Sequence, residues 1–231
     1  MDIRGFIETS FLDWDGKVSS VIFVPNCDFR CPFCSNASLI TKIESLPPIK
    51  TELIDDFLNK RKDFIDGVVR TGGEPTLQAD LPFYIKHLKS HNFLVKLDTN
   101  GSNPQMLKKL ISENLLDYAA MDIKAPLDER YMKVANAPVN LENIKESIKT
   151  IMGAGIDYEF RTTVCPSFLS PSDIEAIARS ITGAKKYVLQ QFSPKETLDP
   201  SLANVRPYSK EELANFCNIC QKYLNTVLRG V

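Results

Sequence analysis

The stretch "SSVIFVPNCDFRCPFC", residues 19–34, joins a short apolar run to a loop that carries three cysteines. The apolar run, residues 19–25, is rich in β-branched residues and has the length of a buried strand. In the loop, three residues separate Cys27 from Cys31, and two separate Cys31 from Cys34. A strand that ends in a chemically reactive loop is therefore the first structural unit that the sequence predicts.

Similar short runs recur along the chain and alternate with amphipathic segments. The further strands are expected at residues 67–71, 93–99, 118–124, 158–164 and 186–192. The helices between them have recognisable N-caps, which are Thr51, Asn140, Ser170, and Ser209 with Glu212 in a capping box. Strand followed by helix, repeated six times, predicts a parallel sheet with helices outside it. We expect an α/β fold, a partial (β/α)6 TIM-like barrel, in a single domain over residues 1–231.

Composition excludes several classes of function. The chain has 231 residues, of which 43% are apolar and 25% charged, as in an ordinary globular domain. Its 28 basic and 29 acidic side chains give a net charge of -1 and no long basic run. There is thus no electrostatic case for binding nucleic acid or a membrane surface. The start, "MDIRGFIETS", lacks a signal-peptide layout, so we expect a cytoplasmic location.

The six cysteines predict a metal site more than disulfides. In a reducing compartment, clustered cysteines favour metal ligation or catalysis. Three thiolates leave one metal position open, which a catalytic site keeps and a structural site does not. Two readings stay open: an open three-cysteine site, or a closed site with a fourth ligand from elsewhere. The remaining cysteines, which we interpret first as buried core residues, are Cys165, Cys217 and Cys220.

Other chemically useful residues follow the predicted strands. Gly72, Gly73 and Glu74 come after the second strand, residues 98–101 end the third, and residues 122–124 end the fourth. In α/β barrels the active site lies at the carboxyl ends of the strands. We therefore expect these residues to belong to the same site as the cysteine loop.

"CDFRCPFC" resembles the CxxxCxxC signature of the radical S-adenosylmethionine enzymes. In that superfamily three cysteines hold a [4Fe-4S] cluster, whose fourth iron binds S-adenosylmethionine. The resemblance implies that Cys27, Cys31 and Cys34 are the cluster ligands and that Phe33 lies against the adenine. "TGGEPTLQ", residues 71–78, is similar to the family's GGE motif, whose backbone meets the methionyl ammonium.

Two further motifs resemble those of glycyl-radical-enzyme activases. They are "LDTNG" (97–101) and "MDIKAP" (121–126). The resemblance implies that Asp98, Thr99, Asp122 and the Ala120 carbonyl bind a monovalent cation, with Lys124 near the cofactor carboxylate. Oxygen ligands suit a hard cation.

The remaining resemblance is more local. "FRTTVCP" (160–166) is similar to a family strand that places Arg161 near the ribose, and Phe192 lies nearest the family's adenine-contacting position. Asn26 stands where a glycine is common before the first cysteine, and Ser35 where a histidine commonly follows the third.

The whole-chain pattern looks most like the activating proteins of anaerobic (class III) ribonucleoside-triphosphate reductase. This resemblance implies reductive cleavage of S-adenosylmethionine and formation of a glycyl radical on the reductase, with no side-chain acid or base. It also implies a one-electron donor such as flavodoxin or ferredoxin. The alternatives are another glycyl-radical enzyme of the pyruvate formate-lyase type, a small-molecule substrate, or a non-catalytic iron–sulfur or zinc protein.

Overall fold

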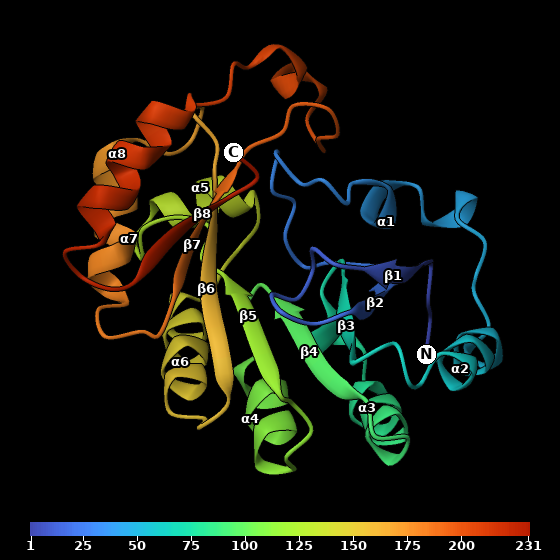
Figure 1. Ribbon diagram of the computed structural model, residues 1–231. Coiled ribbons are helices and arrows are strands. Elements are labelled where there is room, and N and C mark those ends of the chain that lie inside the picture. Colours follow the sequence, from blue (N-terminus) through green and yellow to red (C-terminus); the bar gives the residue numbers. More distant parts are fainter. The chain divides into compact units, whose positions relative to one another are not determined.

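The computed structural model describes residues 1–231 and divides the chain into two compact units (Figure 1). The first unit contains Met1–Cys27, Ser38–Thr99 and Gln105–Ala119. The second contains Asp28–Ala37, Asn100–Pro104 and Ala120–Val231. The chain thus passes from the first unit to the second inside the cysteine loop, after Cys27.

Four strands form the sheet of the first unit. They are β1 (Gly5–Ser10), β2 (Ser19–Val24), β3 (Gly67–Gly72) and β4 (Leu94–Thr99). β1 pairs with β2 in antiparallel orientation, and β2, β3 and β4 pair in parallel. The helical segments here are α1 (Ser38–Thr41), η1 (Ile43–Ser45), α2 (Thr51–Lys60), η2 (Pro75–Leu77), α3 (Leu81–Ser90) and α4 (Pro104–Ser112). Trp14 packs with Val21 and Val69 in a core cluster, which fixes the segment between β1 and β2.

The second unit contains the rest of the alternating pattern. β5 (Tyr118–Asp122) leads into it, and β6 (Asp157–Val164), β7 (Tyr187–Gln191) and β8 (Thr226–Arg229) pair in parallel. Its helical segments are α5 (Arg130–Ala135), α6 (Leu141–Met152), α7 (Pro171–Ser180), η3 (Pro200–Asn204) and α8 (Lys210–Cys220). Figure 1 shows α7 and α8 side by side along β6, β7 and β8.

The structure confirms the α/β class and all six predicted strands. It also confirms three predicted helix starts, since Asn140 caps α6 and capping boxes open α7 at Ser170 and α8 at Ser209. The cap predicted at Thr51 is wrong. Thr51 is already helical, and Lys50, in extended conformation, takes the cap position without a side-chain hydrogen bond. No helix combines the length and apolar character that a membrane span requires.

The strands β1 and β8 were not expected from the sequence, and a buried ion pair holds β8 in place. Arg229 of β8 donates to both carboxylate oxygens of Glu159 on β6, at 2.7 and 3.0 Å. Lys186 lies 3.3 Å from the same carboxylate, and the Glu159 side chain is 1% exposed. A carboxylate buried this deeply must be paired to remain charged. The ion pair therefore holds the short strand β8 in the sheet that it forms with β6 and β7.

Replacing Arg229 tests this interaction. We expect Arg229→Ala to lower the free energy of unfolding by about 2–3 kcal/mol, less than a fully uncompensated buried charge would cost, because Lys186 remains. Urea denaturation of the protein without cofactors measures the effect. Lys145→Ala, which removes an exposed ion pair with Glu142, should leave the urea midpoint unchanged. Equal effects of the two substitutions would contradict the assignment.

Candidate functional site

In the first unit, the turn after β3 packs tightly on the end of β2. A Cβ atom at Gly73 would lie 1.8 Å from the Asn26 carbonyl oxygen, so only glycine fits there. Gly72 has a φ of 124°, a region that side chains avoid. Hydrogen bonds close the contact, from Gly73 N to Val24 O at 2.8 Å and from Glu74 N to Asn26 O at 2.7 Å. The glycines expected to bring backbone near a cofactor are thus required by backbone packing as well.

Asn26 itself has a left-handed backbone, with a φ of 68°. Glycine adopts this conformation without strain, and asparagine tolerates it better than most residues. This accounts for asparagine at the position before the first cysteine where a glycine is common. The departure at Asn26 therefore preserves the geometry of the turn.

The Glu74 side chain ties the ends of β3 and β4 together. It is fully buried and accepts hydrogen bonds from Thr76 N at 3.0 Å, Thr76 Oγ1 at 2.6 Å and Thr99 Oγ1 at 2.8 Å. Hydrogen bonds to a carboxylate are among the stronger ones in proteins. The sequence reasoning assigned Glu74 only through its backbone motif. The available signs of this network were Thr76, two residues after Glu74, and Thr99, the last residue of β4.

Asp98, beside Thr99, ends β4 with an oxygen 3.7 Å from Lys96 Nζ. Asp98 and Thr99 thus stand together in the first unit, whereas Asp122 belongs to the second. The monovalent cation site expected from these three residues stays a prediction.

In the second unit, Cys31 and Cys34 belong to one turn. Cys34 N donates to Cys31 O at 3.0 Å. Burial raises the pKa of Cys31 to about 11, opposed by the positive charge of Lys124, and burial also raises the pKa of Cys34. None of the six cysteines forms a disulfide. No group of three or more histidine, cysteine or acidic side chains is arranged to hold a metal ion, so the three-cysteine ligand set stays a prediction.

Beside this turn lies a partly buried set of charges: Asp122 at the end of β5, Lys124 just after it, and Arg161 within β6. Asp122 accepts from Arg161 Nε at 2.7 Å and from Lys124 Nζ at 3.0 Å. Burial opposes the charge on Asp122, but Arg161 and Lys124 together hold the pKa of its carboxyl well below the usual range. Burial likewise opposes the charge on Lys124, and Asp122 and Cys31 keep its pKa above the usual value. Two of these groups act on Cys31, where Lys124 favours the thiolate and Asp122 opposes it.

Aromatic residues surround the cysteine turn. The Phe33 ring, 6% exposed, packs on Phe168 with centroids 5.9 Å apart. Phe29 meets Tyr131 edge to face at 6.4 Å. Phe192, after β7, is buried. Sequence reasoning singled out Phe33 and Phe192 and missed Phe168 and Tyr131, whose roles depend on packing between distant segments.

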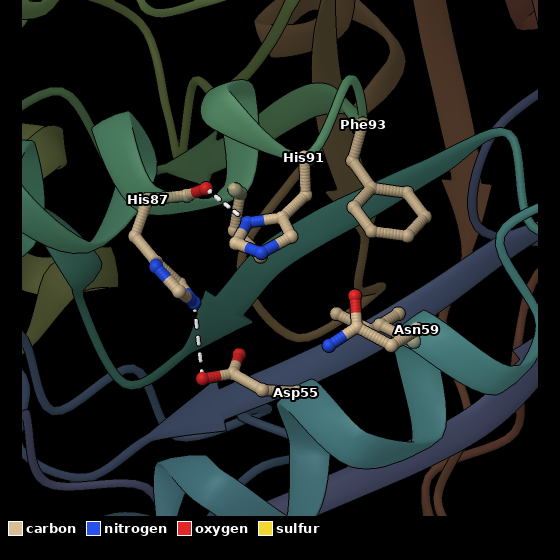
Figure 2. Close-up of a pocket in the computed structure, with 7 residues that line it drawn as sticks. Asp55, Asn59, His87, His91 and Phe93 are labelled. Atoms are coloured by element: carbon tan, nitrogen blue, oxygen red, sulfur yellow. Dashed lines mark hydrogen bonds and ion pairs between the residues drawn. The ribbon is translucent and has the colours of Figure 1, made fainter.

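A small, partly open pocket lies between α2 and α3 of the first unit (Figure 2). Figure 2 shows both histidines of the chain beside it, with His87 Nε2 3.0 Å from Asp55 Oδ2 and His91 Nδ1 3.0 Å from the His87 carbonyl oxygen. His91 is the C-cap residue of α3. None of the predicted site residues lines this pocket.

Comparison with known proteins places the chain in context. The Radical SAM superfamily pattern matches residues 21–181. A Methanocaldococcus jannaschii protein named "Putative glycyl-radical enzyme activating enzyme" is 33% identical over 99% of this chain and 96% of its own length. The 7-carboxy-7-deazaguanine synthase of Thermococcus kodakarensis is 25% identical over 90% of this chain and 91% of its own.

Solved structures of low sequence identity share the fold. Streptococcus suis SuiB bound to its precursor peptide SuiA has a TM-score of 0.70 at 14% identity, over 91% of this chain and 48% of that one. A domain of a Bacteroides vulgatus pyruvate-formate lyase-activating enzyme has a TM-score of 0.59 at 17% identity, over 71% and 99%.

Gly73→Ala tests the backbone contact at the glycine turn. Because the added Cβ would meet backbone rather than a flexible side chain, we expect a loss of about 1–3 kcal/mol in the free energy of unfolding. Chemical denaturation of the protein without cofactors provides the measurement. The matched control is Gly153→Ala, whose Cβ would meet its nearest neighbour, Lys149 O, at an ordinary 3.4 Å. A Gly73→Ala protein as stable as this control would refute the close approach.

Proposed function

The chain belongs to the radical SAM superfamily, and we propose that it is an activating enzyme that forms a glycyl radical on anaerobic ribonucleoside-triphosphate reductase. One observation carries the activating role: the 33% identity to the Methanocaldococcus jannaschii activating enzyme extends over nearly the full length of both chains. The choice of the reductase as partner rests on the resemblance of the whole-chain sequence pattern to activating proteins of that reductase.

The superfamily implies a [4Fe-4S] cluster and S-adenosylmethionine, and the residues present fit both. Three cysteine thiols in one loop are the usual donors to an iron–sulfur cluster. Next to Cys31, the buried hydroxyl of Tyr131 has no hydrogen-bond partner, so the pocket contains an unused polar group. We assign Cys27, Cys31 and Cys34 as the cluster ligands. When bound, the cluster and S-adenosylmethionine supply one-electron cleavage chemistry.

The protein's own residues bind and orient the cofactor. Lys124 offers its ammonium to the cofactor carboxylate, and Arg161 lies toward the ribose. Asp122 holds both cations in place through the hydrogen bonds described above. We assign the backbone of Gly72, Gly73 and Glu74 to the methionyl ammonium, and Phe33 and Phe192 to the adenine. The monovalent cation would be held by Asp98, Thr99 and Asp122 with the Ala120 carbonyl.

These assignments require no side-chain acid or base, because the protein positions groups and excludes side reactions. Residues 1–231 act as one radical SAM domain in this proposal, with flavodoxin or ferredoxin as the electron donor. The protein works in the cytoplasm, since free thiols and a reducible cluster need a reducing compartment.

A second candidate is action on a small molecule. The similarity to 7-carboxy-7-deazaguanine synthase, at 25% identity, also covers most of both chains. This candidate shares the cluster and cofactor and differs only in what receives the radical. It ranks second because its sequence identity is lower than the 33% of the activating enzyme.

The open three-cysteine site can be tested with cysteine variants. After anaerobic reconstitution with iron and sulfide and reduction with dithionite, the wild type should convert S-adenosylmethionine to 5′-deoxyadenosine, measured by chromatography. Cys31→Ala should abolish the product because it removes a cluster ligand. Cys165→Ala, Cys217→Ala and Cys220→Ala serve as matched controls and should retain it. Loss of cluster in any of these three would favour the closed four-ligand site instead.

The partner can be identified by electron paramagnetic resonance. We expect incubation of the reduced, cluster-loaded protein with S-adenosylmethionine and anaerobic ribonucleotide reductase to produce a glycyl radical signal. The signal should be absent when alanine replaces the reductase's radical-bearing glycine. A glycyl radical signal on pyruvate formate-lyase, without one on the reductase, would instead identify the protein as an activase of the pyruvate formate-lyase type. Cofactor cleavage without a radical on either enzyme would favour the small-molecule candidate.

A further inference from the structure

Tyr131 is a buried tyrosine whose hydroxyl has no hydrogen-bond partner. Its side chain is 0% exposed, and its oxygen is among the few buried polar atoms that remain unsatisfied. Leaving a hydroxyl unpaired in the protein interior is costly, and native structures rarely do so without a reason. A bound ligand is one such reason, so the surroundings of the hydroxyl indicate what it could bind.

The cysteine loop packs directly on the helix that carries Tyr131. Phe29 of the loop meets the Tyr131 ring edge to face at 6.4 Å. Arg30 N donates to the carbonyl oxygen of Ala135, at the end of α5, at 2.8 Å. These contacts on both sides of α5 hold the Tyr131 ring in a fixed orientation relative to Cys31, which follows Arg30 directly.

Three ionisable groups act on the Tyr131 hydroxyl: Lys124, Cys31 and Asp122. The Lys124 ammonium is a donor and cannot accept the hydroxyl proton. Asp122 is engaged by Arg161 and Lys124, and it accepts no hydrogen bond from the tyrosine. The sulfur at Cys31 is the other acceptor among these neighbours. The backbone N–H of Lys124 also lies near the tyrosine oxygen. Because an N–H group is a donor, it does not use the hydroxyl proton, which remains available for an acceptor at Cys31.

We propose that Tyr131 is a positioning residue for the cluster and that its hydroxyl donates a hydrogen bond to sulfur at the Cys31 corner. This inference rests on the proposed function and adds a residue that tunes the cluster. Hydrogen bonds to cluster sulfurs stabilise the reduced, more negative state and raise the reduction potential. Tyrosine suits the role because burial raises the pKa of the Tyr131 hydroxyl above its usual value, so it stays protonated at neutral pH. The same bond should slow loss of the cluster.

Tyr131→Phe separates this role from a structural one. Without cofactors, the variant should melt at the wild-type temperature or about 2–4 °C higher, because it removes an unsatisfied buried hydroxyl. With the cluster loaded and no S-adenosylmethionine present, its midpoint potential should become more negative. Loss of the cluster to an iron chelator should become on the order of 10-fold faster. A stabilised empty protein with a weakened cluster is the expected signature.

Two tyrosines provide matched controls for the same substitution. Tyr187, fully buried in the same unit, donates to Thr162 Oγ1 at 2.8 Å. Tyr187→Phe should therefore lower the melting temperature and leave the potential unchanged. Tyr84 in the first unit is buried with an unsatisfied hydroxyl, like Tyr131, but has Arg70 and Asp55 as its charged neighbours. Tyr84→Phe should leave both the potential and the rate of cluster loss unchanged.

The outcomes distinguish this inference from the proposed function. If wild type cleaves S-adenosylmethionine and Tyr131→Phe has the wild-type potential and rate of cluster loss, the inference is wrong and the function stands. A lower melting temperature of the empty variant would also overturn it, because the hydroxyl would then have a structural partner. If the wild type takes up no cluster, both the function and the inference fail.

Discussion

The contact between the Asn26 and Gly73 backbones is the constraint on which the first unit's chemistry depends. It allows no side chain at position 73 and joins the end of β2 to the end of β3. In the sequence, Cys27 directly follows Asn26, and Glu74 directly follows Gly73. The Glu74 carboxylate then extends the connection to Thr99 at the end of β4. Three strand ends are thus tied by one backbone contact and one buried side chain, so each loop begins from a fixed position.

The second unit keeps three charged side chains partly buried and close together: Asp122, Lys124 and Arg161. Burial disfavours the charged forms of Asp122 and Lys124, yet their mutual attraction and the nearby Arg161 exceed that cost. Asp122 contributes one negative charge against two positive ones, so the set keeps a net positive charge. Such an environment favours a bound carboxylate, whereas burial raises the pKa of the Cys31 thiol and Lys124 only partly offsets that rise. The net positive charge of this set therefore favours the binding of an anionic ligand at the end of β5.

The sequence could predict those features that depend on local patterns. Short β-branched runs revealed the six inner strands, and Ser170 and Ser209 marked helix starts because a cap and its partner are three residues apart. The strand β8 was missed because its 4 residues gain their stability from the distant Glu159. Tyr131 was missed for a similar reason, since its burial depends on how the cysteine loop packs on α5. Motifs therefore located the candidate site, while the residues that support it became visible only in the structure.

The buried cysteines bear on whether the metal position stays open. Cys217 Sγ donates to the Thr226 carbonyl oxygen at 3.2 Å, and Cys220 Sγ lies 3.8 Å from that of Ile174. Both thiols thus serve the packing of α8 against its neighbours, and burial raises the pKa of Cys220 to about 12. The thiol of Cys31 must also lose its proton to bind metal, so the raised pKa alone does not distinguish Cys220 from a ligand. Recruiting Cys217 or Cys220 as a fourth ligand would in addition require breaking helix packing. This cost favours an arrangement in which the fourth position is left to a small molecule.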